Sequence, residues 1–146
     1  MASPGMMGLT QLLASMTPTL DLGTYVFCTT SQDRLGDIAS IDGVQMLFRE
    51  AEGWTIILPQ HKADELALLS AFPCKKITLN VHSSLDAVGF IATIARKLAE
   101  LEIGVNPVSG FYHDHLFIPV GKEGEVMDSL RNMTEGAQRE IQEGAS

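Results

Sequence analysis

The sequence has few cysteines, few basic residues and no long uninterrupted hydrophobic run. Its 146 residues include two cysteines, and ten Lys and Arg stand against eighteen Asp and Glu, a formal net charge of −8. This charge argues against nucleic-acid and anionic-membrane partners, because the average field repels phosphate groups. Cys28 and Cys74 lie in apolar segments of a chain long enough to fold without disulfides, so we predict buried free thiols and a cytoplasmic location.

Sequence motifs for targeting and catalysis are also missing. Residues 1–20 carry no charge, and Pro and Gly residues interrupt them, so they have neither the basic start of a signal peptide nor a membrane span. We find no GxSxG, GxxxxGK[ST], HExxH or paired CxxC, and no GxGxxG after a strand. We therefore predict a non-enzymatic protein without a cofactor.

Hydrophobic periodicity predicts alternating strands and helices. In the first half we expect helix 7–16, strand 24–30, a polar loop 31–43, strands 44–50 and 54–59, and helix 59–72. In the second half we expect strand 75–81, helix 83–101, strands 103–112 and 115–120, and helix 121–133.

The predicted order of elements indicates an α+β fold with helices on one face of an antiparallel sheet. Such a sheet has open edges, which favour pairing with another chain, so we expect a homodimer or a higher homo-oligomer. Residues 135–146 hold two glycines and few apolar side chains, which predicts a disordered tail.

The segment VHSSLDAVG joins a predicted strand to the longest predicted helix. Ser83 and Asp86 have the spacing of a capping box, and free amides at a helix start attract a carboxylate without a basic side chain. The alternative is a structural cap with no ligand. Gly89 falls inside the predicted helix at a cost of about 1 kcal/mol, so we expect close approach of a ligand or tight packing on the sheet.

The triplet His113-Asp114-His115 follows Gly110 at a corner between two strands. Two histidines alone make a weak metal site, so a third ligand would have to come from His82, His61 or an acidic residue. The triplet could instead contact a small ligand or form a hydrogen-bonded turn. The sequence leaves these three alternatives open.

Several separated motifs together resemble a bacterial family of small ACT-domain proteins. They are YVFCTT, FREAEGWTIIL and the run from KITLNVHSSLDAVGF to FYHDHLFIPV, and the resemblance extends over about residues 8 to 132. It implies two ACT-like units of the aspartate-kinase regulatory type in one chain, each with a ferredoxin-like βαββαβ fold. We expect an N-terminal unit over 1–70 and a C-terminal unit over 71–134.

The resemblance also implies an amino-acid-binding site at the interface between paired units. Carried over to this sequence, it places ligand contacts in the strand-to-helix turn and on the strand that follows. With the triplet, the expected ligand-binding residues are Ser83, Ser84, Leu85, Asp86, Val88, Gly89, Asn106, His113, Asp114 and His115.

The sequence departs from the family pattern at two points. Such domains usually have Ala-Gly-Ile after the main helix, whereas this chain has Leu101-Glu102-Ile103, so either a non-glycine residue takes a left-handed conformation or the turn is looser. The C-terminal unit also lacks a fourth strand, which strand 24–30 or a partner chain would have to supply.

Three functions therefore remain to be compared. We predict a regulatory module that binds an amino acid. The alternatives are a metal-dependent enzyme using His113 and His115, and a structural or partner-binding module without a ligand.

Overall fold

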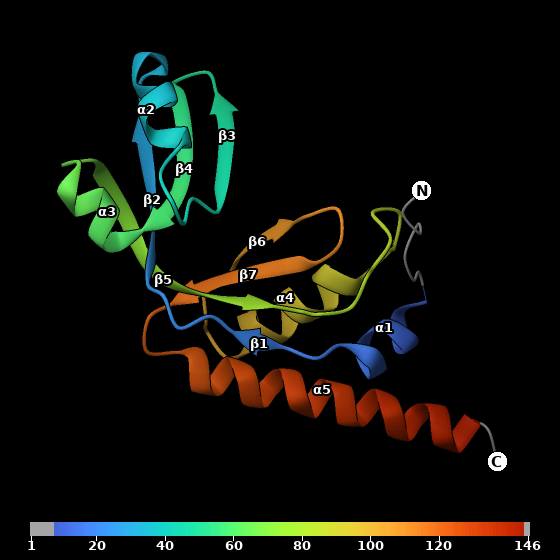
Figure 1. The fold of residues 1–146 in the computed structure, drawn as a ribbon. Helices are drawn as coiled ribbons and strands as arrows, with labels where there is room; N and C mark the ends of the chain where they lie inside the picture. The colour runs from blue at the N-terminus through green and yellow to red at the C-terminus, as the bar shows by residue number, and fades with distance from the viewer. Residues whose placement is uncertain (1–7, 145–146) are drawn as a thin grey trace. The chain divides into compact units, whose positions relative to one another are not determined.

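The computed structural model describes residues 8–144, which form two compact units (Figure 1). One unit, here called the terminal unit, joins the two ends of the chain, up to Asp21 and from Lys75 onward. The other, here called the inserted unit, is the continuous segment Leu22–Cys74. Each unit has its own sheet region and its own hydrophobic core.

The inserted unit contains the six elements of a βαββαβ fold, with one additional 3₁₀ turn. They are β2 (Tyr25–Thr30), η1 (Gln32–Arg34), α2 (Leu35–Ala39), β3 (Met46–Glu50), β4 (Gly53–Pro59), α3 (Gln60–Glu65) and the first part of β5 (Leu69–Thr78). Its strands lie in the order β3-β4-β2-β5, and the pairs between them are antiparallel. One face of the sheet presents Val26, Cys28, Ile56 and Leu58 to Ile38 of α2 and Ala63 of α3.

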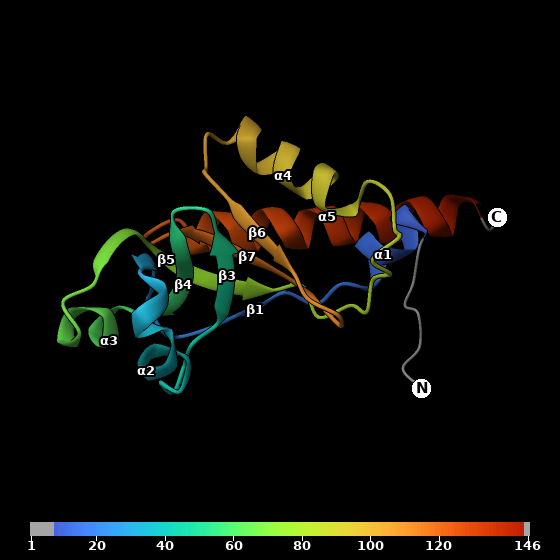
Figure 2. The ribbon, with the colours of Figure 1, turned by 90° about the horizontal axis from the view of Figure 1, so that it is seen from above.

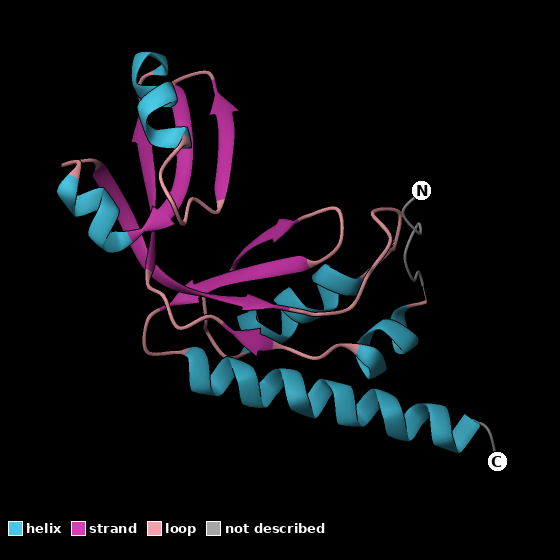
Figure 3. Ribbon diagram, in the orientation of Figure 1, coloured by secondary structure: helices cyan, strands magenta, loops and turns pink. Residues whose placement is uncertain are grey.

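The terminal unit places three helices against a second group of strands (Figures 2 and 3). Its elements are α1 (Leu9–Ser15), β1 (Thr19–Leu20), the rest of β5, α4 (Phe90–Glu100), β6 (Asn106–Ser109), β7 (Asp114–Pro119) and α5 (Glu123–Gly144). The strand order is β1-β5-β7-β6. The α+β class and the helix-covered sheet are therefore confirmed.

A single core holds the terminal unit together. Leu12 of α1, Ile94 of α4 and Leu130 of α5 are fully buried against the strand residues Ile77 and Leu116. Burial of aliphatic side chains from all three helices contributes roughly 1.5 to 3 kcal/mol for each residue before chain entropy is subtracted. This core fixes α4, whose first turn forms one wall of the candidate site.

The missing fourth strand comes from the chain's own N-terminal segment. In β1, Thr19 and Leu20 pair antiparallel with Thr78 and Ile77 of β5. The suggestion that strand 24–30 completes the C-terminal unit was wrong, because β2 pairs with β4 and with the first part of β5 inside the inserted unit.

The spatial units differ from the predicted boundaries 1–70 and 71–134. Residues 8–21 pack in the terminal unit because the apolar face of α1 is buried against α4 and α5. The predicted disordered tail 135–146 was wrong over residues 135–144, which form the end of α5, with Ala137 buried. Residues 1–7 and 145–146 lie outside the described part of the chain.

The predicted helix 59–72 is shorter than expected. The helix α3 ends at Glu65, Ala67 takes a positive φ of 51°, and β5 begins at Leu69. The apolar run from 66 to 72 is compatible with either structure, and pairing with β2 makes most of it strand.

Between residues 8 and 144, no helix combines the length and the apolar character needed to cross a bilayer.

Candidate functional site

The longest predicted helix begins later than its sequence pattern indicated. The helix α4 starts at Phe90, and Gly89 is its N-cap with φ 91° and ψ −9°. The predicted start at Ser83 was wrong because a hydrogen-bonded turn precedes the helix. In that turn the Asp86 amide donates to Ser84 Oγ at 3.1 Å, and the Ala87 amide donates to the Ser84 carbonyl at 3.0 Å.

Gly89 has a different role from the one expected inside a helix. A Cβ at this position would meet only Leu9 Cδ2, at 3.8 Å, so packing leaves room for a side chain. The backbone conformation is what favours glycine, because φ 91° is strained for other residues. The glycine therefore allows the chain to turn from the loop into α4.

The amides of Ser83 and Asp86 are hydrogen-bonded within the loop, whereas the first turn of α4 has free amides. The first intrahelical bond runs from the Thr93 amide to the Gly89 carbonyl, at 2.9 Å. The amides of Phe90, Ile91 and Ala92 therefore have no hydrogen-bond acceptor within the helix. They carry the positive end of the helix dipole and can bind an anion.

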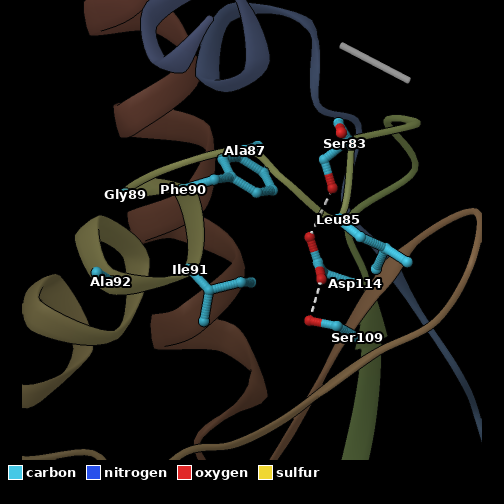
Figure 4. A pocket seen from close by; sticks show the side chains of 10 residues that line it. Ser83, Leu85, Ala87, Gly89, Phe90, Ile91, Ala92, Ser109 and Asp114 are labelled. Atoms are coloured by element: carbon cyan, nitrogen blue, oxygen red, sulfur yellow. Dashed lines mark hydrogen bonds between the residues drawn. The ribbon is translucent and has the colours of Figure 1, made fainter. Parts of the chain in front are cut away.

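A cavity of about 220 Å³ opens beside this first turn (Figure 4). The loop after β5, the start of α4 and the β6–β7 hairpin all contribute to its walls. The lining residues are Ser83, Ser84, Leu85, Ala87, Gly89, Phe90, Ile91, Ala92, Ser109 and Asp114. This volume suits a molecule of about amino-acid size rather than a nucleotide cofactor.

Asp114 is the charged group of this cavity and is held by two hydroxyls. Ser83 Oγ donates to Asp114 Oδ2 at 2.8 Å, and Ser109 Oγ donates to Asp114 Oδ1 at 2.5 Å (Figure 4). The residue is 6% exposed. A buried carboxylate costs free energy unless it is hydrogen-bonded, and each oxygen here keeps a further lone pair for another donor.

The other two members of the triplet do not line this cavity. His115 Nδ1 lies 2.8 Å from Thr78 Oγ1, and burial, followed by the charges of Lys76 and His113, lowers the pKa of His115. His113 Nδ1 is buried without a hydrogen-bond partner. The alternation of a strand explains the split, because adjacent side chains of an extended segment point to opposite faces.

A metal site has no geometric support within residues 8–144. No three His, Cys, Asp or Glu side chains of that range gather closely enough to hold an ion. His82, one candidate third ligand, packs its ring against Tyr112 with centroids 5.3 Å apart and against Phe111 at 6.3 Å.

The structure brings together half of the predicted ligand-binding residues. Ser83, Ser84, Leu85, Gly89 and Asp114 line the cavity. Asp86, Val88, Asn106, His113 and His115 do not, and the Val88 side chain is 83% exposed.

Five lining residues were missed by sequence reasoning: Ala87, Phe90, Ile91, Ala92 and Ser109. Ser109 could have been found from the hairpin, since a two-residue turn at Phe111 and Tyr112 places Ser109 opposite Asp114.

The two cysteines offer no second reactive site. Cys28 and Cys74 are buried and unpaired, as predicted. Burial raises the pKa of Cys74 to about 11, and burial followed by the charge of Asp64 raises that of Cys28. Both therefore stay protonated thiols and poor nucleophiles near neutral pH.

Comparisons with known proteins agree with this architecture. Two ACT-domain family models match the chain, one over residues 4–75 and the other over residues 72–132. A comparison with curated protein sequences gives no match.

Solved structures extend the likeness over most of the chain. A protein of unknown function from Vibrio cholerae, described as a possible transport protein, is 41% identical, with a TM-score of 0.77 over 86% of this chain and 95% of that one. A protein from Agrobacterium tumefaciens is 19% identical, with a TM-score of 0.69 over 82% and 89%. The ligand-free regulatory subunit of aspartate kinase from Thermus thermophilus is 11% identical, with a TM-score of 0.62 over 83% and 97%.

The last two likenesses show the fold alone, and the Thermus protein identifies it as the fold of an aspartate-kinase regulatory subunit. The two family matches give one conclusion: the chain belongs to the ACT-domain family and carries two ACT-type segments.

Proposed function

We propose that this protein is a non-enzymatic regulatory module that binds a free amino acid in the cavity beside α4. The observation that carries the proposal is the pairing of two opposite recognition elements in one cavity. The amides of the first turn of α4 suit an α-carboxylate, and the Asp114 carboxylate suits an α-ammonium group.

The remaining walls are compatible with this ligand. Ser84 is 9% exposed, and its hydroxyl oxygen accepts a hydrogen bond from the Asp86 amide. The Ser84 hydroxyl proton is therefore available to a bound molecule. Leu85, Ala87 and Ile91 add apolar surface for a side chain. The family assignment supports a small-molecule-binding, regulatory role, whereas the identity of the ligand rests on the cavity.

We further expect a homo-oligomer located in the cytoplasm. Strand β3 lies at an open edge of the sheet and carries Phe48, which is 62% exposed, so this edge can contact a second copy. Sedimentation of the purified protein should give more than one chain per particle. A monomer at all concentrations would reject this part of the proposal.

The direct experiment is calorimetry, combined with thermal unfolding, against the twenty amino acids. An amino acid present at 100 times its Kd should raise the free energy of unfolding by about 2.7 kcal/mol. Asp114→Asn should weaken binding at least about tenfold, because it removes the charge that faces the ammonium group. Asp128→Asn, the same change at an exposed carboxylate of α5, is the matched control and should leave binding unchanged.

Two other outcomes would replace the proposal. If none of the twenty amino acids binds and a stable protein complex is recovered on pull-down, the partner-binding module is favoured. Stoichiometric metal in the purified protein, lost on substitution of His113 and His115, would favour the metal-dependent enzyme.

A further inference from the structure

The side chains that line the cavity beside α4 include a negatively charged group and no positively charged one. Asp114 provides one full negative charge, and none of the ten lining residues is Lys, Arg or His. Three lining residues are serines, and the others are glycine or apolar. Within the lining, positive potential therefore comes only from hydrogen-bond donors, namely the amides at the first turn of α4 and the serine hydroxyls.

One ligand carboxylate is the most that these amides can accommodate. The dipole of a helix corresponds to roughly half an elementary charge at its N-terminus and acts within the first turn. An α-carboxylate placed there uses the available donors of Phe90, Ile91 and Ala92. A second carboxylate on the same ligand would have serine hydroxyls and apolar side chains as its neighbours.

Asp114 would also repel a second carboxylate of the ligand. It is 6% exposed and lines the same cavity of about 220 Å³, so a second carboxylate on a bound ligand would lie close to it. Like charges about 6 Å apart in a partly enclosed site repel enough to change affinity by about tenfold or more, even with some solvent screening.

We infer that the site discriminates by charge: it takes amino acids with an uncharged or basic side chain and rejects the dicarboxylic ones. Asp114 and the absence of a lining cation determine this specificity. The inference rests on the proposed function, since it concerns the ligand of the same cavity.

Two pairs of nearly isosteric ligands isolate the charge. Calorimetry at neutral pH should compare glutamine with glutamate and asparagine with aspartate, because the members of each pair differ mainly by one negative charge. We expect the amide member of at least one pair to bind, and to bind about tenfold or more tightly than its acid. An acid that binds as tightly as its amide would overturn the inference and leave the proposed function standing.

A variant with an added cation tests the cause. Leu85 lines the cavity at its rim and is 67% exposed, so Leu85→Lys should fold and should place an ammonium group at the mouth. We expect the amide-to-acid affinity ratio to fall at least about threefold in this variant. Val88→Lys, in the same loop but 83% exposed and outside the lining, is the matched control and should keep the wild-type ratio.

The outcomes separate the two proposals. No response to any amino acid, in a folded wild type, rejects the proposed function and the inference together. An unchanged ratio in Leu85→Lys, or an equal change in Val88→Lys, rejects the assignment of specificity to charge inside this cavity.

Discussion

At the scale of single residues, the end of α4 shows a conformation that its sequence disfavours. Glu102 has φ 58°, and it completes a Schellman motif. The Ile103 amide donates to the Leu98 carbonyl, and the Glu102 amide donates to the Ala99 carbonyl, both at 3.0 Å. Of the two alternatives for this turn, a left-handed non-glycine residue and a looser turn, the structure has the first.

Glu102→Gly should therefore stabilise the protein. A non-glycine residue in the left-handed conformation destabilises the folded state by about 1–2 kcal/mol. Glycine removes this strain, but its larger entropy in the unfolded chain lowers stability by about 0.5–1 kcal/mol. We expect a net gain of about 0.5–1 kcal/mol in chemical denaturation. Glu102→Ala, which removes the charge and keeps the strain, should show no comparable gain, and equal stability of wild type and Glu102→Gly would contradict the argument.

His115 gives a second prediction at this scale, on pH. Burial, then Lys76 and His113, hold its pKa below the usual 6.5 in the folded protein, with Asp114 acting in the opposite direction. As pH falls through 6.5 the unfolded chain takes up a proton before the folded chain does, so folding stability decreases. The decrease stops once the pH is below the folded-state pKa.

The measurement compares wild type with His115→Gln between pH 8 and pH 5. Wild type should lose more stability than the variant over the acidic part of this range. A difference in stability that is independent of pH would show that His115 does not titrate on unfolding in this range.

At the scale of elements, the start of α4 shows why local sequence gave the wrong boundary. Ser83 and Asp86 have the spacing of a capping box, but the Ser83 hydroxyl bonds to Asp114, 31 residues away. A single sequence contains no signal for that long-range bond. Gly89 was noticed because it is unfavourable inside a helix, and its positive φ places it at the helix boundary.

Gly89→Ala should test this boundary. Since a Cβ has room at this position, the cost should be the backbone strain alone, about 1–2 kcal/mol, together with weaker ligand binding. Gly104→Ala is the control, because a Cβ there has no neighbour within 4 Å. Thermal unfolding should show a loss for the first variant and little change for the second. Equal stability of the two variants would mean that the turn relaxes.

Some of the other elements are determined by residues close to them in the chain, and others by long-range pairing. Helix α1 and strands β2, β4 and β7 follow from periodicity and turn residues close to them in the chain. The switch from α3 to β5 does not, because an apolar run such as LALLSAF suits either structure until β2 pairs with it. In the site, Asp114 was predicted from its unusual setting, whereas Ile91 and Ala92 were missed with the helix boundary.

At the scale of the whole molecule, the N-terminal segment belongs with the C-terminal half. Leu12 of α1 is fully buried in the core that α4 and α5 share. Leu12→Ala should cost about 2–4 kcal/mol, because the cavity left behind can collapse only in part. Hydrogen exchange should become faster in α4 and α5, with little change in α2 and β3.

Leu22→Ala provides the control for this prediction, since the Leu22 side chain is 92% exposed. It should change stability by no more than about 0.5 kcal/mol. Faster exchange confined to the inserted unit in the Leu12 variant would contradict the assignment of α1 to the terminal core.

The discontinuous terminal unit has a consequence for biosynthesis. On the ribosome, residues 8–21 emerge well before their packing partners α4 and α5. The segment 22–74 has all its strands available much earlier, and domains generally fold as units during synthesis. The nascent chain therefore carries Leu12 and Met16 unburied until α4 and α5 have been synthesised, and during that interval they are a target for chaperones.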